Sequence, residues 1–159
     1  MQNRHIDVEL LFSHEPLSPE LALQVYRTWQ EVPGLGGIVT FFGQVRADEH
    51  ENGTVTAIDF TAHEEMAVRA VRELAEEVAE EAADPLFYAF IRHRLGHVPV
   101  GEYPVMIVVG TGHRDRAYAA SRRLIDGLKE RALIFGREIL DAGGHVWKQA
   151  CVHCGPCGT

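Results

Sequence analysis

Two neighbouring residues, His113 and Arg114, have side chains that can bind an anion. They follow the apolar run VMIVV and open the stretch HRDRAYAASRRLIDGLKERA. We expect a strand before the pair and a helix after it, and the unpaired N–H groups of a helix start attract anions. The pair is therefore a candidate anion site; a capping and surface pair is the equal alternative.

Arg46 is a second candidate, because it ends the apolar stretch 34–46 directly after Gln44 and Val45. Gly43 permits the close approach of another backbone or of a ligand at this point. The planar fork of an arginine can bind a phosphate or a carboxylate. On position alone, the favoured alternative is a solvated arginine at a strand end.

Lys129 lies beside an apolar helical stripe made of Leu124, Leu128, Ala132 and Phe135. A lysine at the edge of such a stripe is partly desolvated, which lowers its pKa toward values useful in acid–base or nucleophilic chemistry. More often such a lysine extends its ammonium group into water. Taken by itself, Lys129 favours this second interpretation.

The spacing of His113 and Lys129 restricts how they can act together. At a rise of about 1.5 Å per residue, they lie about 24 Å apart along one straight helix. They cannot share a ligand within one chain unless the helix bends sharply. Either they serve different sites, or a second subunit brings its own His113 near Lys129, which predicts a dimer with composite sites.

Two further groups of residues suit chemistry but favour structural interpretations. In the stretch RHR at 92–94, Arg92 and Arg94 share one face of a strand, and His93 on the other face is expected to be a structural histidine. The tail CVHCGPC carries cysteines whose spacing could hold zinc, namely Cys151, Cys154 and Cys157. Because they form a single crowded cluster, we favour an exposed or disordered tail, assign no metal, and expect no disulfide framework.

The elements that position these residues can be read from apolar periodicity and turn signals. We expect strands over 5–12, 34–46, 55–63, 86–96, 103–112 and 145–152, and helices over 17–32, 64–83 and from Arg114 toward Gly143–Gly144. Strand 34–46 is so apolar that burial on both faces is expected, and Asn52–Gly53 marks a turn. This order predicts a mixed α+β fold.

Composition limits the domain number and the class of partner. The chain has 159 residues and a net charge of −8, which predicts one domain over 1–150 followed by a cysteine-containing tail over 151–159. No membrane span or signal peptide is expected, so we expect a cytoplasmic protein. The acidic charge argues against a nucleic-acid partner. Residues 113–159 are nonetheless basic, with 8 Lys/Arg against 5 Asp/Glu, which suits a small anionic ligand.

Several separated motifs between residues 34 and 135 occur together, in the same order as in a known protein family. They are GGIVTFFGQVR, HEEMA, IRHRLGHVPVGE, GTGHRDRAYAA and LKERA. In this combination the sequence resembles the large, catalytic subunit of molybdopterin synthase. The resemblance implies an α+β fold of the α/β-hammerhead type, with a mixed sheet, flanking helices and an additional small antiparallel sheet.

The resemblance also implies an activity. Such an enzyme transfers sulfur from the thiocarboxylated C-terminus of a ubiquitin-like small subunit to cyclic pyranopterin monophosphate, and it needs no cofactor. A homodimer of large subunits carries one small subunit at each end. By position, Gln44, Val45, Arg46, His113 and Arg114 are implied to bind the pterin substrate, and Lys129 is implied to be the first of two catalytic lysines.

The sequence departs from the family pattern at the second lysine. Seven residues after Lys129 stands Gly136, and the proline that ends the family's helix is absent. In the favoured interpretation the helix continues through Leu140, and Lys148 in VWKQA is the second catalytic lysine. In the other, FGRE is the true counterpart and the lysine is lost. The chain would then be a degenerate paralogue that binds the pterin or the small subunit, or a metal-responsive interaction protein.

Overall fold

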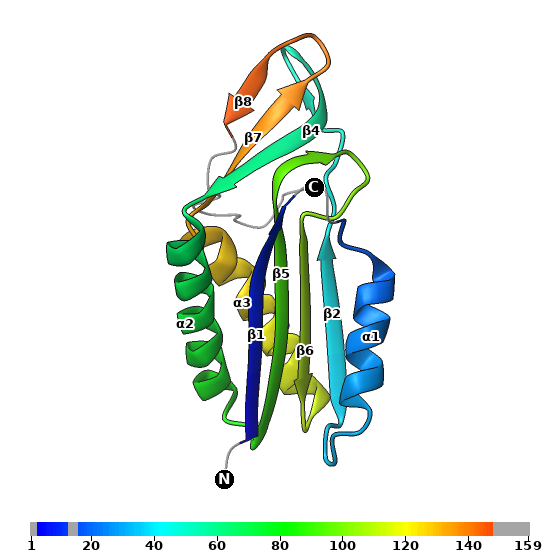
Figure 1. Ribbon diagram of the computed structural model, residues 1–159, viewed down its shortest axis with the longest axis vertical. Coiled ribbons are helices and arrows are strands. Elements are labelled where there is room, and N and C mark those ends of the chain that lie inside the picture. Colours follow the sequence, from blue (N-terminus) through cyan, green and yellow to red (C-terminus); the bar gives the residue numbers. More distant parts are fainter. Residues whose placement is uncertain (1–2, 13–15, 148–159) are drawn as a thin grey trace, which may run out of the picture.

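The computed structural model describes residues 3–12 and 16–147 as one layered α+β fold (Figure 1). Its strands are β1 (Asn3–Phe12), β2 (Gly37–Gly43), β3 (Glu49–His50), β4 (Gly53–Ala62), β5 (Leu86–Pro99), β6 (Val105–Thr111), β7 (Ile134–Leu140) and β8 (His145–Trp147). Its helices are α1 (Pro19–Trp29), α2 (Glu64–Ala82) and α3 (Arg114–Arg131). The tail cysteines and Lys148 lie outside the described residues.

A large mixed sheet forms the body of the molecule. Its strands lie in the order β1-β5-β6-β2, with β1 parallel to β5 and the other pairs antiparallel. Alternate residues of β6 face opposite layers: Ile107 packs with α2 and α3, whereas Met106 and Val108 pack with α1. The helices therefore cover both faces of the sheet, as Figure 1 shows.

The expectation that the strand 34–46 is buried on both faces is wrong. Among the described strands β2 pairs with β6 alone, so it forms an edge of the large sheet, and its residues are half-buried or, at Ile38, exposed. The fully buried strand is β6, in which every residue is buried. Apolar content predicted a central strand, but the pairing order placed β6 there.

A smaller antiparallel sheet stands at one end of the body. Residues 96–99 of β5 leave the large sheet and pair with β4, which also pairs with β7, and β7 pairs with β8. Gly96 has a positive φ of 83° where the strand bends, a conformation that favours glycine. The predicted turn at Asn52–Gly53 joins β3 to β4. The α+β class with a mixed sheet and a small antiparallel sheet is thus confirmed.

The favoured course of the last helix is wrong. α3 ends at Arg131, and residues 134–140 form β7 instead of continuing the helix through Leu140. Leu133 adopts a positive φ of 55° directly after the helix, which breaks the helical path. The segment IFGREIL then pairs with β4 over its full length, and its Ile and Phe residues favour strands.

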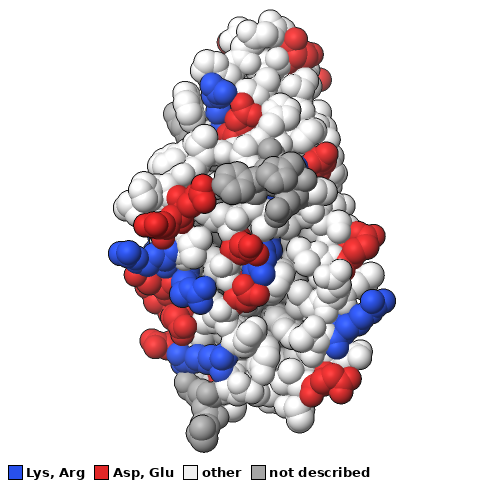
Figure 2. Space-filling model, in the orientation of Figure 1, with Lys and Arg blue, Asp and Glu red and all other residues white. Residues whose placement is uncertain are grey.

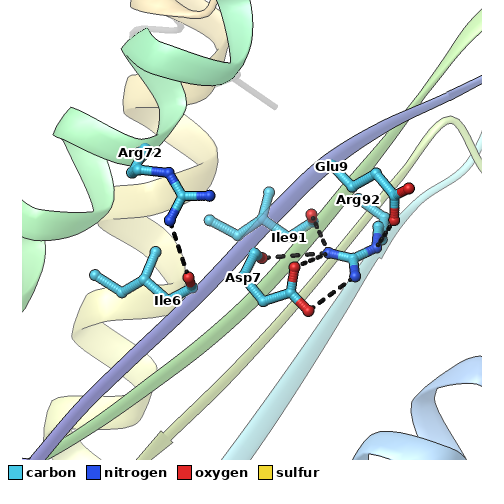
Figure 3. Close-up of polar contacts among 6 residues, drawn as sticks. All are labelled: Ile6, Asp7, Glu9, Arg72, Ile91 and Arg92. Atoms are coloured by element: carbon cyan, nitrogen blue, oxygen red, sulfur yellow. Dashed lines mark hydrogen bonds and ion pairs between the residues drawn. The ribbon is translucent and has the colours of Figure 1, made fainter.

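Arg92 ties the edge strand β1 to β5 (Figure 3). Its guanidinium, with only 9% of the side chain exposed, lies 3.0 Å from Asp7 Oδ2 and 3.1 Å from Glu9 Oε2. It also donates to Asp7 Oδ1 and to the carbonyl oxygens of Asp7 and Ile91. The group lies 3.7 Å from the centre of the Phe90 ring. A buried arginine is thereby fully paired, as such a group must be.

His93 is a buried structural histidine, as its alternation with two arginines predicted. Its Nδ1 donates to the Arg94 carbonyl oxygen at 2.7 Å, and its ring meets the Phe60 ring edge-on at 5.0 Å. Burial lowers the pKa of His93 to about 4 from an ordinary 6.5, outweighing the hydrogen bond to the Arg94 backbone. The ring is therefore neutral in the folded protein at neutral pH.

This lowered pKa predicts a loss of stability in mild acid. Between pH 6.5 and about 4 the unfolded chain binds a proton at His93 that the folded chain does not, so stability falls as the pH falls. From pH 7 to pH 4.5 the loss should reach about 2–3 kcal/mol, at about 1.4 kcal/mol per unit of pH. Urea unfolding of the wild type and of His93→Gln at both pH values measures it. Equal pH dependence in the two proteins would contradict the assignment.

Candidate functional site

The loop before α3 positions His113 and Arg114 at one end of the large sheet. α3 begins at Arg114 with His113 as its N-terminal cap, and the His113 side chain makes no capping hydrogen bond. A Cβ on Gly36 would lie 2.2 Å from the Gly112 oxygen, and one on Gly37 would lie 2.8 Å from the Arg114 Cα. These two glycines thus let β2 approach the loop closely, while the His113 and Arg114 side chains remain exposed.

The segment 44–46 leaves β2 at the opposite end of the sheet. Gln44 donates its side-chain amide to the Gly101 oxygen at 3.2 Å. Val45 is buried in the core of the small sheet, and its backbone bonds to residues 101 and 102. Arg46 is 76% exposed and lies 2.9 Å from Asp48. Val45 therefore anchors the segment, while Gln44 and Arg46 present their side chains at its surface.

Lys129 lies in the last turn of α3 and is exposed. Leu124, Leu128 and Ala132 form the predicted apolar stripe and are buried, whereas Phe135 lies on β7 and is 57% exposed. The exposure of Lys129 agrees with the favoured interpretation, in which the lysine extends its ammonium group into water. Within the described residues it has no carboxylate within ion-pair distance.

The elements that carry the sequence-predicted cations place them at opposite ends of the large sheet: β6 ends and α3 begins at one end, whereas β2 and α3 end near the small sheet (Figure 1). β2 and β6 are antiparallel, with Gly37 opposite Thr111 and Gly43 opposite Val105. Arg46 follows the end of β2 and His113 follows the end of β6, so the two residues leave the sheet at different ends. α3 returns from the His113 end toward the small sheet, which separates Lys129 from His113 by about 24 Å. One chain therefore does not bring all of these cations together.

Much of the basic C-terminal third is neutralised by carboxylates. Arg131 and Arg123 of α3 pair with Glu77 and Glu81 of α2, and the hydrogen bonds from Arg131 lower the pKa of Glu77. Arg137 lies 2.9 Å from Asp59. Figure 2 accordingly shows blue and red side chains intermixed along the side where α2 lies. Carboxylates thus neutralise part of the local positive charge that the sequence predicted for residues 113–159, and fewer basic side chains are left to bind a ligand.

Within the described part of residues 113–159, the cations without a close carboxylate partner are ones that the sequence singled out. Arg114 has only a distant contact with exposed Asp115, at 3.8 Å, and Lys129 has no carboxylate partner in the part of the chain that the structure describes. His113 also lacks an ion pair among those residues. These side chains can therefore turn toward an anion without first breaking a buried interaction.

Gly136, seven residues after Lys129, lies buried in β7 opposite Phe60. A Cβ on this glycine would lie 3.2 Å from Ile58 Cγ2 and 3.3 Å from Phe60 Cε1. The segment FGRE is thus the strand that follows the helix, as the second interpretation of the sequence required. Lys148 follows the last described residue, Trp147 of β8.

Other classes of site find no support among the described residues. In residues 3–12 and 16–147 there is no group of three or more His, Cys, Asp or Glu side chains that could hold a metal ion. The zinc candidates Cys151, Cys154 and Cys157 lie outside these ranges. Each described helix is too short or too polar to cross a membrane.

Comparison with protein families places this arrangement in a known group. Residues 12–131 match the family model described as MoaE protein. A protein of Emericella nidulans named molybdopterin synthase catalytic subunit is 31% identical over 144 residues, which cover 91% of this chain and 70% of the relative. A protein of the same name from Pyrococcus abyssi is 37% identical over 110 residues, covering 68% of this chain and 71% of the relative.

Solved structures share the fold. Molybdopterin synthase from Staphylococcus aureus superposes with a TM-score of 0.75 at 26% identity, covering 88% of this chain and 95% of that one. A Helicobacter pylori structure, described as the complex of subunits 1 and 2 of molybdopterin-converting factor, has a TM-score of 0.69 at 16% identity. It covers 89% of this chain and 90% of that one.

Proposed function

Because the chain belongs to the MoaE protein family, we propose that it is the catalytic subunit of a molybdopterin synthase. The observation that carries the proposal is the family match over residues 12–131, which includes Arg46, His113, Arg114 and Lys129. The reaction is a sulfur transfer that converts cyclic pyranopterin monophosphate to the dithiolene of molybdopterin. Its sulfur donor is the thiocarboxylate of a small subunit.

The proposed roles follow from the chemistry of the exposed cations. The substrate is a phosphorylated pterin; Arg46 and Arg114 supply charged donors suited to a phosphate, and His113 adds a ring N–H donor. Gln44 adds a neutral amide beside Arg46. The Lys129 ammonium can donate a proton or stabilise negative charge that develops during sulfur transfer.

We further propose a homodimer, because the ends of α3 must meet for these roles to combine. A groove lined by Val39, Phe41, Tyr118 and Ile125 lies between β2 and α3, and Tyr118 is 64% exposed. The helix residues that line it centre on Arg122, close to the middle of α3. A two-fold axis through this point and perpendicular to α3 would set two copies of α3 antiparallel, so that His113 and Arg114 of one copy face Lys129 of the other.

A small subunit is the proposed second partner, and the Helicobacter pylori complex of subunits 1 and 2 supports it. Exposed apolar side chains come after Lys129 in the sequence: Leu133 at 42%, Phe135 at 57% and Trp147 at 58% exposure. Exposed aromatic side chains of this kind mark protein interfaces. A partner seated on them would deliver its C-terminus beside Lys129.

Lys148 remains our candidate for the second catalytic lysine, since Gly136 supplies no side chain. The rival proposal is a degenerate subunit that binds its partners without turnover, and the loss of an amine at position 136 favours it. Lys148→Ala separates the two. An active wild type that loses turnover in this variant, while still binding the precursor, supports the enzyme with Lys148 as its second amine.

Reconstitution tests the function directly. The purified chain, a thiocarboxylated small subunit and cyclic pyranopterin monophosphate should yield the dithiolene product, and Lys129→Ala should reduce the rate at least about 100-fold. Arg27→Ala, which removes an exposed cation from α1, serves as the control and should leave the rate unchanged. A folded wild-type complex that binds both partners without forming product would reject the proposal in favour of the degenerate subunit.

A further inference from the structure

Asp84 is a buried carboxylate in the short connection between α2 and β5. Only 1% of its side chain is exposed. Its Oδ1 accepts hydrogen bonds from the Leu86 N–H at 3.0 Å and from the Gly112 N–H at 3.2 Å. The first bond shapes the connection itself. The second reaches across 28 positions of sequence to the loop that carries His113 and Arg114.

Arg116 holds the other side of this carboxylate. Its Nε lies 3.7 Å from Asp84 Oδ2, and its Nη1 donates to the carbonyl oxygens of Ala82, at 2.8 Å, and Ala83. The guanidinium therefore joins the first turn of α3 to the last turn of α2. Asp84 and Arg116 together fix the start of α3 against the end of α2.

The loop around Gly112 depends on such backbone contacts. The Gly36 N–H donates to the Thr111 oxygen at 3.0 Å, and the Thr111 hydroxyl donates to the His113 oxygen at 2.7 Å. Among the residues that the structure describes, the exposed side chains of His113 and Arg114 have no buried hydrogen-bond or ion-pair partner. Their direction is consequently set by the backbone at residues 111–113, of which Asp84 holds the Gly112 amide.

We propose that Asp84 is a positioning residue for the anion site, acting through the Gly112 N–H and Arg116 to aim His113 and Arg114 at the substrate phosphate. The proposal rests on the proposed function of these two cations. A buried carboxylate is costly to desolvate, and a simple turn between α2 and β5 needs only the bond to Leu86. The links to Gly112 and Arg116 extend its effect to the site.

Asp84→Asn probes this role with little change of shape. The NH₂ group of the new asparagine must face either Arg116 or the Gly112 N–H. In both orientations one hydrogen-bond donor faces another donor. Either orientation disturbs one of the two links. Asp115→Asn is the matched control, because it removes the same charge from an 89% exposed carboxylate that lies beside Arg114.

The measurement is the dissociation constant of cyclic pyranopterin monophosphate, by calorimetry, together with KM and kcat in the reconstituted reaction. Asp84→Asn should weaken binding and raise KM about five- to tenfold, because it removes the charge that pairs with Arg116 or, in the other orientation, the bond to Gly112, with kcat within about twofold. Asp115→Asn should leave both constants unchanged or improve them. If Asp84→Asn does not fold, Arg116→Met provides the same measurement from the other partner.

The possible outcomes distinguish a failure of the proposed role of Asp84 from a failure of the proposed function. A lower melting temperature with unchanged affinity, measured well below melting, would show that Asp84 serves stability alone and overturns its role as a positioning residue. Weaker precursor binding in Asp84→Asn but not in Asp115→Asn supports the role even if the wild type shows no turnover. A wild type that binds no precursor overturns both proposals.

Discussion

Two inactive variants of this chain should regain about a quarter of the wild-type turnover when they are mixed and allowed to exchange subunits. One variant carries His113→Ala and Arg114→Ala, and the other carries Lys129→Ala. Each alone should lose at least about 100-fold in rate, because each lesion is present in both sites of its homodimer. Rates of the reconstituted sulfur transfer measure the recovery.

The expected recovery follows from the opposite placement of these cations on α3. Random exchange makes about half of the dimers mixed, and in each of these one site receives both lesions while the other receives none. One intact site in half of the dimers is about a quarter of all sites. If the cations instead served one site within a single chain, mixing would restore nothing.

A third variant with all three substitutions provides the control. Mixed with Lys129→Ala, it leaves Lys129 absent from both sites, so no turnover should return. Light scattering and labelled subunits establish that exchange has occurred. Efficient exchange without recovery in the first mixture would refute composite sites, and with them the proposed antiparallel arrangement of α3.

Replacing Arg92 with methionine should cause a large loss of stability, about 2–3 kcal/mol of the free energy of unfolding. Removing one partner of a buried ion pair costs about 3–5 kcal/mol when the other charge stays buried. Here Asp7 and Glu9 are 42% and 56% exposed, so water can solvate part of what is lost. Urea unfolding at pH 7 provides the measurement.

Arg72→Met is the matched control, because Arg72 is an arginine of α2 whose side chain contacts the same strand, β1. Arg72 makes one hydrogen bond to β1, from its Nη1 to the Ile6 oxygen at 3.2 Å, and it does so at an exposed site (Figure 3). Its loss should cost less than about 1 kcal/mol. Similar costs for the two variants would show that the paired carboxylates at Arg92 do not hold β1 in place.

The sequence predicted those parts of the fold that local patterns determine. Helical spacing located α1 and α2, the Asn52–Gly53 signal located the turn before β4, and the glycine-flanked His113 marked the start of α3, whereas the short strand β3 was not predicted. The end of α3 was missed, because helix periodicity persisted past Arg131 and no proline stood there. A positive φ at Leu133 and pairing with β4, a strand more than 70 residues earlier, ended the helix.

The candidate site was predicted as a set of residues, but its environment was not. Arg46, His113, Arg114 and Lys129 were chosen by type and spacing, and all four are exposed. For Lys129 the favoured interpretation, an ammonium group extended into water, agrees with its exposure, although the apolar stripe beside it also allowed desolvation. Asp84 was missed, since an Asp-Pro pair signals only a turn, and its link to Gly112 exists only after folding.

β5 belongs to both sheets, being the second strand of the body through residue 95 and a strand of the small sheet from residue 96. The small sheet therefore cannot move as a unit independent of the large sheet, because β5 runs without a break from one sheet into the other. Force applied by a protein seated on β7 and β8 would be transmitted along this shared backbone past His93 and Arg92. Mechanical load at one end of the molecule thus reaches the strand that anchors its N-terminal edge.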